Sequence, residues 1–212
     1  MKYFEEMGSA VIKGDRETVV QLTQKAVDDE VDLLDVINKG LISGMDVVGQ
    51  RFKQGDMFVP EVLMSAKSMK GGMDIVKPLI VEGDIPSSGK IVLGTVAGDL
   101  HDIVKNLVGM LMESASIELI NLGTDISPED FVKAVREHKP DVLGMSALLT
   151  TTMLAMRDTI EVLKEEGLRD KVKIIVGGAP VTKEFADEIG ADGWAPDAAS
   201  AKDLTLELIN SK

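Results

Sequence analysis

The feature that most constrains the fold is a short apolar run at residues 91–96 that ends abruptly in a turn of small residues. A run of this length, rich in β-branched residues, predicts a buried strand, and the pattern after the turn predicts a helix from Ile103. The turn carries Asp99 and His101, an acid and a histidine two positions apart. Open α/β sheets bind ligands at the carboxyl ends of central strands, so this turn is the first candidate for a functional site.

Strands alternate with helices along the whole C-terminal part of the chain. The alternation predicts an α/β domain with a parallel sheet and right-handed crossovers, and we expect the flavodoxin-like, Rossmann-like strand order. The helix after the second strand has a strong start, because Ser127 can cap it and proline follows. Five strands are expected at residues 91–96, 117–122, 142–146, 172–176 and 192–195, and helices at 103–112, from 128 to before Pro140, and at 151–166, 182–189 and 198–209.

The N-terminal part of the chain reads as helical throughout. Apolar residues recur every three or four positions at residues 31–52 and again at 63–80, which is the pattern of amphipathic helices. Asp15 is placed to cap the helix that precedes them. Gly40 and Gly44 fall inside the first stripe and predict a kink or a break there. Four helices with short connections predict a bundle.

A stretch rich in glycine, proline and serine separates these two parts at residues 82–89. Its composition is that of a turn or linker, and we expect the domain boundary there. The expected organisation is therefore an all-α helical bundle cap at residues 1–85 followed by a five-stranded α/β domain at 90–212. The linker is the natural hinge between them.

Composition excludes several classes of function. A net charge of −13 argues against a nucleic-acid partner, and the absence of cysteine excludes disulfides, iron–sulfur clusters and thiolate metal sites. No uncharged apolar run approaches the length of a bilayer span and no signal-peptide core is visible, so we expect a cytoplasmic protein with no membrane partner. Neither Gly-x-Gly-x-x-Gly nor a phosphate-loop pattern occurs, which disfavours dinucleotides and triphosphates.

The Asp99–His101 pair suits a metal-ligating histidine, because a carboxylate beside an imidazole fixes its tautomer and raises its basicity. One histidine alone makes no protein metal cage, and the other histidine, His138, reads as a solvated residue at a helix end. A single ligand suits a cofactor that brings its own equatorial donors, such as a haem or a corrin. The alternative interpretation is a turn aspartate beside a surface histidine that binds nothing.

Small residues cluster at the expected carboxyl ends of three strands, where missing Cβ atoms would open a slot for a slim ligand group. The alternative for any one of them is a tight turn. The segment at residues 146–152 is rich in hydroxyls and faces the same edge, or else forms a helix N-cap cluster. The apolar connector at 57–60 could cover a planar ligand, whereas the other methionine-rich stripes suit core packing. The small residues are Gly94, Gly98, Gly144, Ala147, Gly177, Gly178 and Ala179.

Residues 98–103, Gly-Asp-Leu-His-Asp-Ile, resemble the Asp-x-His-x-x-Gly signature of cobalamin-binding domains. Ser146-Ala147-Leu148 is similar to the Ser-x-Leu element of that signature and Gly177-Gly178 to its Gly-Gly element. The helices around residues 44–61 look like the cap domain of the same proteins. The chain as a whole is similar to the small corrinoid proteins of methanol and methylamine methyltransferase systems, which are related to the cobalamin module of methionine synthase.

The resemblance implies that the cofactor is cobalamin and that His101 is the lower cobalt ligand in place of the cofactor's own benzimidazole, the base-off, His-on state. It implies that Asp99 bonds the other imidazole nitrogen, that Thr152 bonds Asp99, and that the displaced nucleotide tail lies in the slot. Val104 stands where the signature has glycine, so we expect it to narrow the slot or to shift the helix start. The implied cofactor-binding residues are Gly98, Asp99, Leu100, His101, Asp102, Ile103, Val104, Ser146, Leu148, Thr150, Thr152, Gly177, Gly178, Ala199 and, from the cap, Phe58.

The function implied by the resemblance is that of a methyl carrier. Such a protein shuttles a methyl group between a substrate-specific methyltransferase and an acceptor methyltransferase, with a reductive activase as a further partner, and is not catalytic alone. It is the corrinoid subunit of a multi-component cobalamin-dependent methyltransferase. The alternative is a cobalamin-dependent sensor or regulator, which usually appends a basic DNA-reading module that this acidic chain does not show.

Overall fold

The computed structural model of the protein describes residues 2–80 and 88–211. The chain divides into two compact units, one comprising Met1–Pro86 with Ser114–Ser116 and the other comprising Ser87–Glu113 and Ile117–Lys212. The predicted linker at 82–89 lies mostly outside the described residues, so its role as a hinge stays a prediction, as do the exact domain limits. No helix in the described ranges is long and apolar enough to cross a bilayer.

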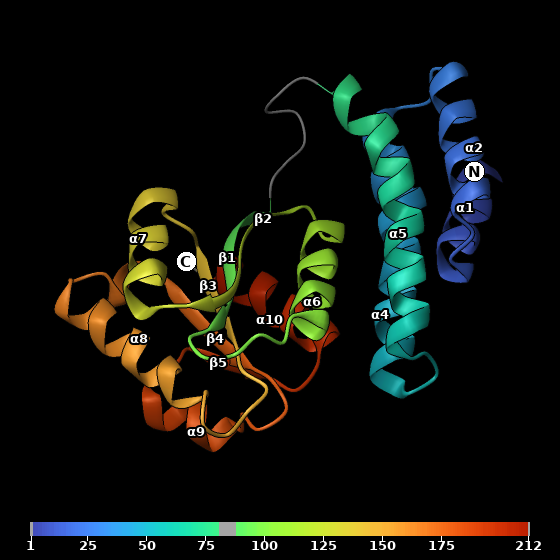
Figure 1. Cartoon of the computed structure of the whole chain (residues 1–212). Helices are drawn as coiled ribbons and strands as arrows, with labels where there is room; N and C mark the ends of the chain where they lie inside the picture. The colour runs from blue at the N-terminus through green and yellow to red at the C-terminus, as the bar shows by residue number, and fades with distance from the viewer. Residues whose placement is uncertain (1, 81–87, 212) are drawn as a thin grey trace. The chain divides into compact units, whose positions relative to one another are not determined.

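The first unit is built from helices that lie lengthwise beside one another (Figure 1). Asp15 caps the second helix as predicted, since its Oδ1 accepts a hydrogen bond from the Thr18 amide at 3.0 Å. The elements are α1 (Lys2–Lys13), α2 (Arg16–Asp28), α3 (Leu33–Asp35), the π-helical segment η1 (Val36–Ile42), α4 (Ser43–Gln54), α5 (Val59–Val76) and the 3-10 turn η2 (Lys77–Leu79).

The two glycines inside the third helical stretch lie where it packs against α1. The chain stays helical from Leu33 to Gln54, and the expected kink or break takes the form of a π-helical segment that contains Gly40. A Cβ on Gly44 would lie 2.8 Å from the Gly8 carbonyl oxygen, and one on Gly40 would lie 2.6 Å from the Met7 sulfur. The glycines therefore let this helical stretch approach α1 closely.

The second unit is a five-stranded parallel sheet in the order β2-β1-β3-β4-β5. This is the flavodoxin-like order, so the predicted fold class, a helical part followed by a Rossmann-like α/β part, is confirmed. Helices α7 and α8 pack on one face of the sheet, and α6 and α10 lie on the other (Figure 1). The strands are β1 (Gly89–Val96), β2 (Ile117–Ile126), β3 (Val142–Ser146), β4 (Lys173–Gly177) and β5 (Gly193–Ala195); the helices are α6 (Ile103–Ser114), α7 (Pro128–His138), α8 (Leu154–Glu165), the 3-10 turn η3 (Arg169–Lys171), α9 (Lys183–Ile189) and α10 (Ala198–Asn210).

Two elements differ from their predicted limits in ways that matter for the site. Strand β2 runs on to Ile126, because its pairing with β1 continues past two register shifts on either side of Gly94. Helix α8 begins at Leu154 instead of residue 151, because residues 149–153 form a turn in which the Thr152 and Met153 amides donate to the Leu149 carbonyl. Both departures bring extra backbone to the carboxyl end of β1.

Candidate functional site

The centre of the site is the Asp99 side chain, which is fully buried in the turn after β1. Its Oδ1 accepts hydrogen bonds from the His101 backbone amide at 3.0 Å and pairs with His101 Nδ1 at 2.7 Å. Its Oδ2 accepts from the Leu148 amide at 2.7 Å and from the Thr152 hydroxyl at 2.8 Å. The carboxylate thus joins the turn after β1 to the turn after β3, and it brings together the three residues expected to interact.

The Asp99 carboxyl is held in its ionised form. Burial raises its pKa, but hydrogen bonds from the Leu148 and His101 amides and from the Thr152 hydroxyl outweigh burial and hold the pKa well below the ordinary value of 3.8. An ionised carboxylate accepts hydrogen bonds and donates none. The hydrogen between Asp99 and His101 therefore belongs to the imidazole.

The imidazole of His101 is presented outward with a free nitrogen. Because Nδ1 carries the hydrogen that points to Asp99, the Nε2 lone pair of the neutral ring is available to a ligand. The side chain is 53% exposed, and Nε2 has no hydrogen-bond partner among the residues that the structure describes. The buried Thr95 hydroxyl donates to the His101 carbonyl at 2.9 Å and fixes the backbone beneath the ring. This geometry fits a metal that needs one imidazole ligand.

Exposed apolar side chains lie on the His101 loop and on the turn that Asp99 joins to it, and we call them the apolar rim. Leu100 is 74% exposed beside His101, and Ile103 and Val104 are exposed on the first turn of α6. Three more come from the turn after β3 and the start of α8, which Asp99 ties to the His101 loop: Leu148, Leu149 and Leu154. Large apolar groups left in water mark a binding surface. The rim suits a broad, largely apolar ligand that covers the imidazole.

The predicted slot of small residues is wrong at two positions. A Cβ on Gly94 would lie 2.7 Å from the Phe131 ring, and one on Gly144 would lie 2.8 Å from Leu93. Both glycines face space that the protein's own side chains fill, so they serve core packing. Ala147 is also fully buried, and its carbonyl oxygen would lie 1.8 Å from a Cβ on Gly178. Gly178, at a φ of 125°, therefore allows the turns after β3 and β4 to touch through their backbones.

The remaining predicted residues lie at the same sheet edge, and their contact with a cofactor stays a prediction. Gly98 is exposed at a φ of 79°, whereas Ser146, Gly177 and Gly178 are partly buried. Thr150 is exposed, and Ala179, a residue of the predicted slot, is exposed too. Ala199 is buried in the first turn of α10, which leaves only its backbone for a ligand.

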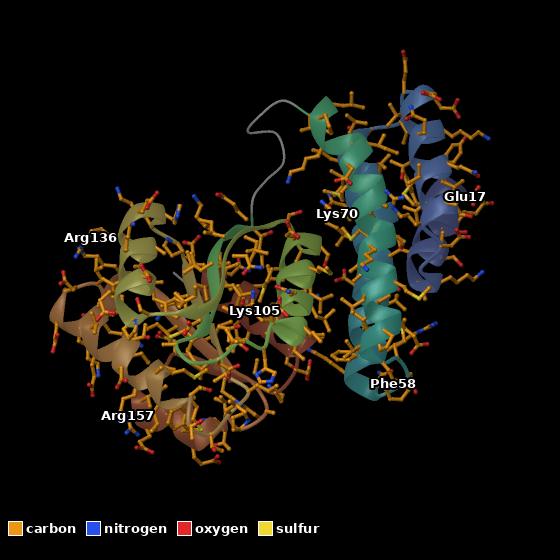
Figure 2. The ribbon with its side chains drawn as sticks, in the orientation of Figure 1. Glu17, Phe58, Lys70, Lys105, Arg136 and Arg157 are labelled. Carbon is orange, nitrogen blue, oxygen red and sulfur yellow. The ribbon has the colours of Figure 1, made fainter. Side chains whose placement is uncertain are left out.

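Asp102 is partly buried, and its side chain accepts a hydrogen bond from the Asn106 side-chain Nδ2 at 2.8 Å. Phe58, labelled in Figure 2, is exposed at the start of α5 in the first unit, so its role toward a cofactor also stays a prediction. Helix α6 begins at Ile103 as predicted, and the narrowing of the slot by Val104 stays a prediction.

The sequence analysis missed a buried cation beside the site. Lys105 on α6, labelled in Figure 2, is 2% exposed, and its Nζ donates to the side-chain oxygens of Asn106 at 2.9 Å and Asn121 at 2.7 Å. Burial lowers the pKa of this ammonium, and the nearby Asp102 partly opposes the effect. The sequence signal that could have indicated this buried cation is Asn121, a polar residue within the apolar strand β2. Among the described residues, no three His, Cys, Asp or Glu side chains gather as a metal site.

Comparison with known proteins identifies the family. A family model described as a B12 binding domain matches residues 89–202, and a second model with the same description matches residues 3–77. The chain is 48% identical to a corrinoid protein of Desulfitobacterium hafniense, over 99% of this chain and 98% of the relative. It is 43% identical to a dimethylamine corrinoid protein of Methanosarcina acetivorans, over 97% and 96% respectively.

Solved structures agree with the sequence relatives. The methanol:cobalamin methyltransferase complex of Methanosarcina barkeri contains a chain that is 31% identical and superposes with a TM-score of 0.87, covering 100% of this chain and 81% of that one. A cobalamin-binding protein of Desulfitobacterium hafniense is 30% identical with a TM-score of 0.82, covering 97% and 98%. The chain therefore belongs to the B12-binding family of corrinoid proteins, and the cofactor that it binds is a corrinoid.

Proposed function

We propose that this protein is a methyl carrier that holds its corrinoid through His101, with the cofactor's own base displaced from cobalt. The observation that supports the proposal most is the exposed imidazole whose Nδ1 is fixed by a buried carboxylate. That arrangement leaves Nε2 as the one nitrogen offered to a ligand, beside the exposed side chains of the apolar rim. When bound, the corrinoid supplies a cobalt centre that accepts and releases a methyl group.

The chain's own residues tune the ligand nitrogen. The low pKa of Asp99 keeps the shared proton on Nδ1 of the imidazole, so the nitrogen that His101 offers to a ligand is Nε2. Leu148 and Thr152 bond the other carboxylate oxygen, and they fix the direction in which the imidazole points. Partners of this kind commonly change metal affinity by about 10–100-fold when removed.

We propose that the apolar rim contacts the bound cofactor. Leu100, Ile103 and Leu148 of this rim are exposed, and a bound corrin would remove their surface from water. The same surface would keep water from the bond between imidazole and metal. Phe58, exposed in the first unit, is proposed to supply an apolar contact to the cofactor as well.

The proposed partners follow from the relatives. Similar chains carry names of dimethylamine corrinoid proteins, and a solved relative belongs to a methanol:cobalamin methyltransferase complex. We infer that a substrate-specific methyltransferase delivers the methyl group and that an acceptor methyltransferase removes it, while a reductive activase restores the reduced cofactor. Mixing the reconstituted protein with such a methyltransferase and its methyl donor, under reducing conditions, should change the visible spectrum.

The cobalt ligand is tested by comparing His101→Ala with His138→Ala, the matched change at the chain's other histidine. Each full-length variant is reconstituted with hydroxocobalamin. The cobalt is then reduced by one electron to Co(II) and examined by electron paramagnetic resonance. The unpaired electron couples to the axial nitrogen, so 15N labelling of the protein's histidines alters the splitting only where a histidine is bound. We expect that alteration in the wild type and in His138→Ala, and its loss in His101→Ala. An unaltered splitting in the labelled wild type would show that the cofactor keeps its own base.

A further inference from the structure

Strand β2, which lies beside the site, ends in a segment of strained backbone. After its regular pairing with β1, β2 continues through Gly123, at a φ of 93°, to Asp125, at a φ of 57°. Residues with side chains rarely adopt such positive φ values, although aspartate tolerates them better than most. The register shifts at this end are β-bulge-like, and bulges next to functional sites often re-aim a side chain.

In this conformation Asp125 forms two hydrogen bonds with the turn that carries Asp99. Its side-chain Oδ1 accepts a hydrogen bond from the Gly98 amide at 2.7 Å. Its own backbone amide donates to the Asp99 carbonyl at 3.1 Å. The two bonds bracket the Gly98–Asp99 backbone from both ends, and they reach it from the strand opposite to the turn that Leu148 and Thr152 occupy.

These two hydrogen bonds affect the orientation of the His101 imidazole through Asp99. Asp99 must place one carboxylate oxygen against His101 Nδ1 and the other against two donors after β3. A rotation of the Gly98–Asp99 backbone would spoil both sets of bonds at once. Gly98 offers little resistance of its own, because its positive φ and missing side chain leave its backbone free to move.

We propose that Asp125 is a positioning residue that fixes the Asp99 backbone and thereby holds His101 in the Nδ1-protonated, outward-pointing state. Its importance for cobalt rests on the proposed function, but its effect on the imidazole does not. Glycine would adopt the positive φ with less strain, so the presence of aspartate indicates that its carboxylate is used.

The test compares Asp125→Gly with Asp125→Asn in the full chain. Glycine suits the backbone and removes the acceptor, whereas asparagine keeps an acceptor oxygen and also tolerates positive φ. Lys139→Gly is the matched control, since Lys139 also has a positive φ, of 47°, but lies at the end of α7. Three readouts apply: 15N chemical shifts of His101 before reconstitution, hydrogen exchange of the Gly98 amide, and affinity for hydroxocobalamin.

We expect Asp125→Gly to mix the two His101 tautomers, to speed exchange at Gly98, and to weaken hydroxocobalamin binding by about three- to tenfold, less than loss of a direct histidine partner. Asp125→Asn and Lys139→Gly should match the wild type in all three. If Asp125→Gly does not fold, Asp125→Ala takes its place, with Lys139→Ala as its control, because both alanines then carry the strain of a positive φ. Wild-type His101 shifts in the glycine variant, or equal defects in the asparagine variant, would overturn the proposal. Neither result depends on which nitrogen binds cobalt, so a failure here is distinct from a failure of the proposed function.

Discussion

Replacing Thr152 by valine tests whether the Asp99 carboxylate holds the site together. Valine has nearly the shape of threonine, and the change removes the hydroxyl that donates to Asp99 Oδ2 at 2.8 Å. Both residues are buried, so water cannot replace the donor easily. Oδ2 keeps the hydrogen bond from the Leu148 amide, so the carboxylate loses one donor but is not left without a partner on that oxygen.

The size of the effect follows from the charge on the acceptor. A hydrogen bond to a charged group contributes about 1.5–3 kcal/mol net. Because one donor remains on the same oxygen, we take the lower end, about 1.5 kcal/mol of unfolding free energy, which is roughly a tenfold fall in the folded-to-unfolded ratio. Thr159→Val is the matched control: Thr159 is also buried, but its hydroxyl donates to the Ala155 carbonyl in the same helix. That carbonyl is neutral and helix-bonded, so we expect a loss of about 0.5 kcal/mol or less.

The assay is urea unfolding followed by the fluorescence of Trp194, the chain's single tryptophan, which lies on β5 in the same unit as the site. The experiment is run near pH 7 and again in acid. The folded-state pKa of Asp99 is depressed, so its stabilisation is present above the ordinary value of 3.8 and is lost as the pH falls through the folded-state value. The deficit of Thr152→Val should therefore shrink in acid, whereas that of Thr159→Val should stay constant. Equal deficits for the two variants near neutral pH would refute the reasoning.

Three further changes probe the rest of the site. Asp99→Asn should weaken hydroxocobalamin binding by about 10–100-fold in an absorbance titration, because the Nδ1 hydrogen loses its ionised acceptor; an affinity within threefold of the wild type would contradict this. Lys105→Met should cost about 1–3 kcal/mol near pH 7 by removing a buried donor. Burial places the folded-state pKa of Lys105 below its ordinary 10.5, so the stability of the wild type should rise relative to that of Lys105→Met as the pH climbs toward 10.5. A difference in urea midpoint between the two proteins that stays constant with pH would contradict this expectation. Val104→Gly should bind cobalamin at least as tightly as the wild type, because the wider slot for the nucleotide tail outweighs the loss of one side chain from the apolar rim; a clear loss of affinity in a titration would show that the apolar contact of the valine matters more.

Local chemistry made most of the fold predictable. The short β-branched runs gave five strands in the expected places, and the limits of β3 at Val142–Ser146 match the prediction. The Ser127 cap sets the start of α7, as its side chain accepts from the Asp130 amide. The Asp99–His101 contact was foreseeable for the same reason, because residues two apart in a tight turn can meet without help from the rest of the chain.

The parts that escaped prediction depend on residues far apart in the sequence. Gly94 and Gly144 looked like openings at strand ends, yet Phe131 and Leu93 fill the space above them, and only the assembled sheet decides which face each glycine has. Lys105 sits in an ordinary helical pattern, and the acceptor Asn121 that partners its buried ammonium lies on strand β2. Side-chain partners that come from another element leave no periodic signal along the chain.

The polar groups of the site are satisfied by the chain's own residues. Each Asp99 oxygen has two donors, Thr95 satisfies the His101 carbonyl, and no buried side-chain nitrogen or oxygen in the described ranges lacks a partner. What remains open to a ligand is the Nε2 lone pair of His101 and the apolar rim, which both face outward. Cofactor binding should therefore stabilise this unit by covering apolar surface and forming one coordinate bond, with little rearrangement of the hydrogen bonds beneath. The groups that aim the imidazole are therefore the same groups that stabilise the turns after β1 and β3.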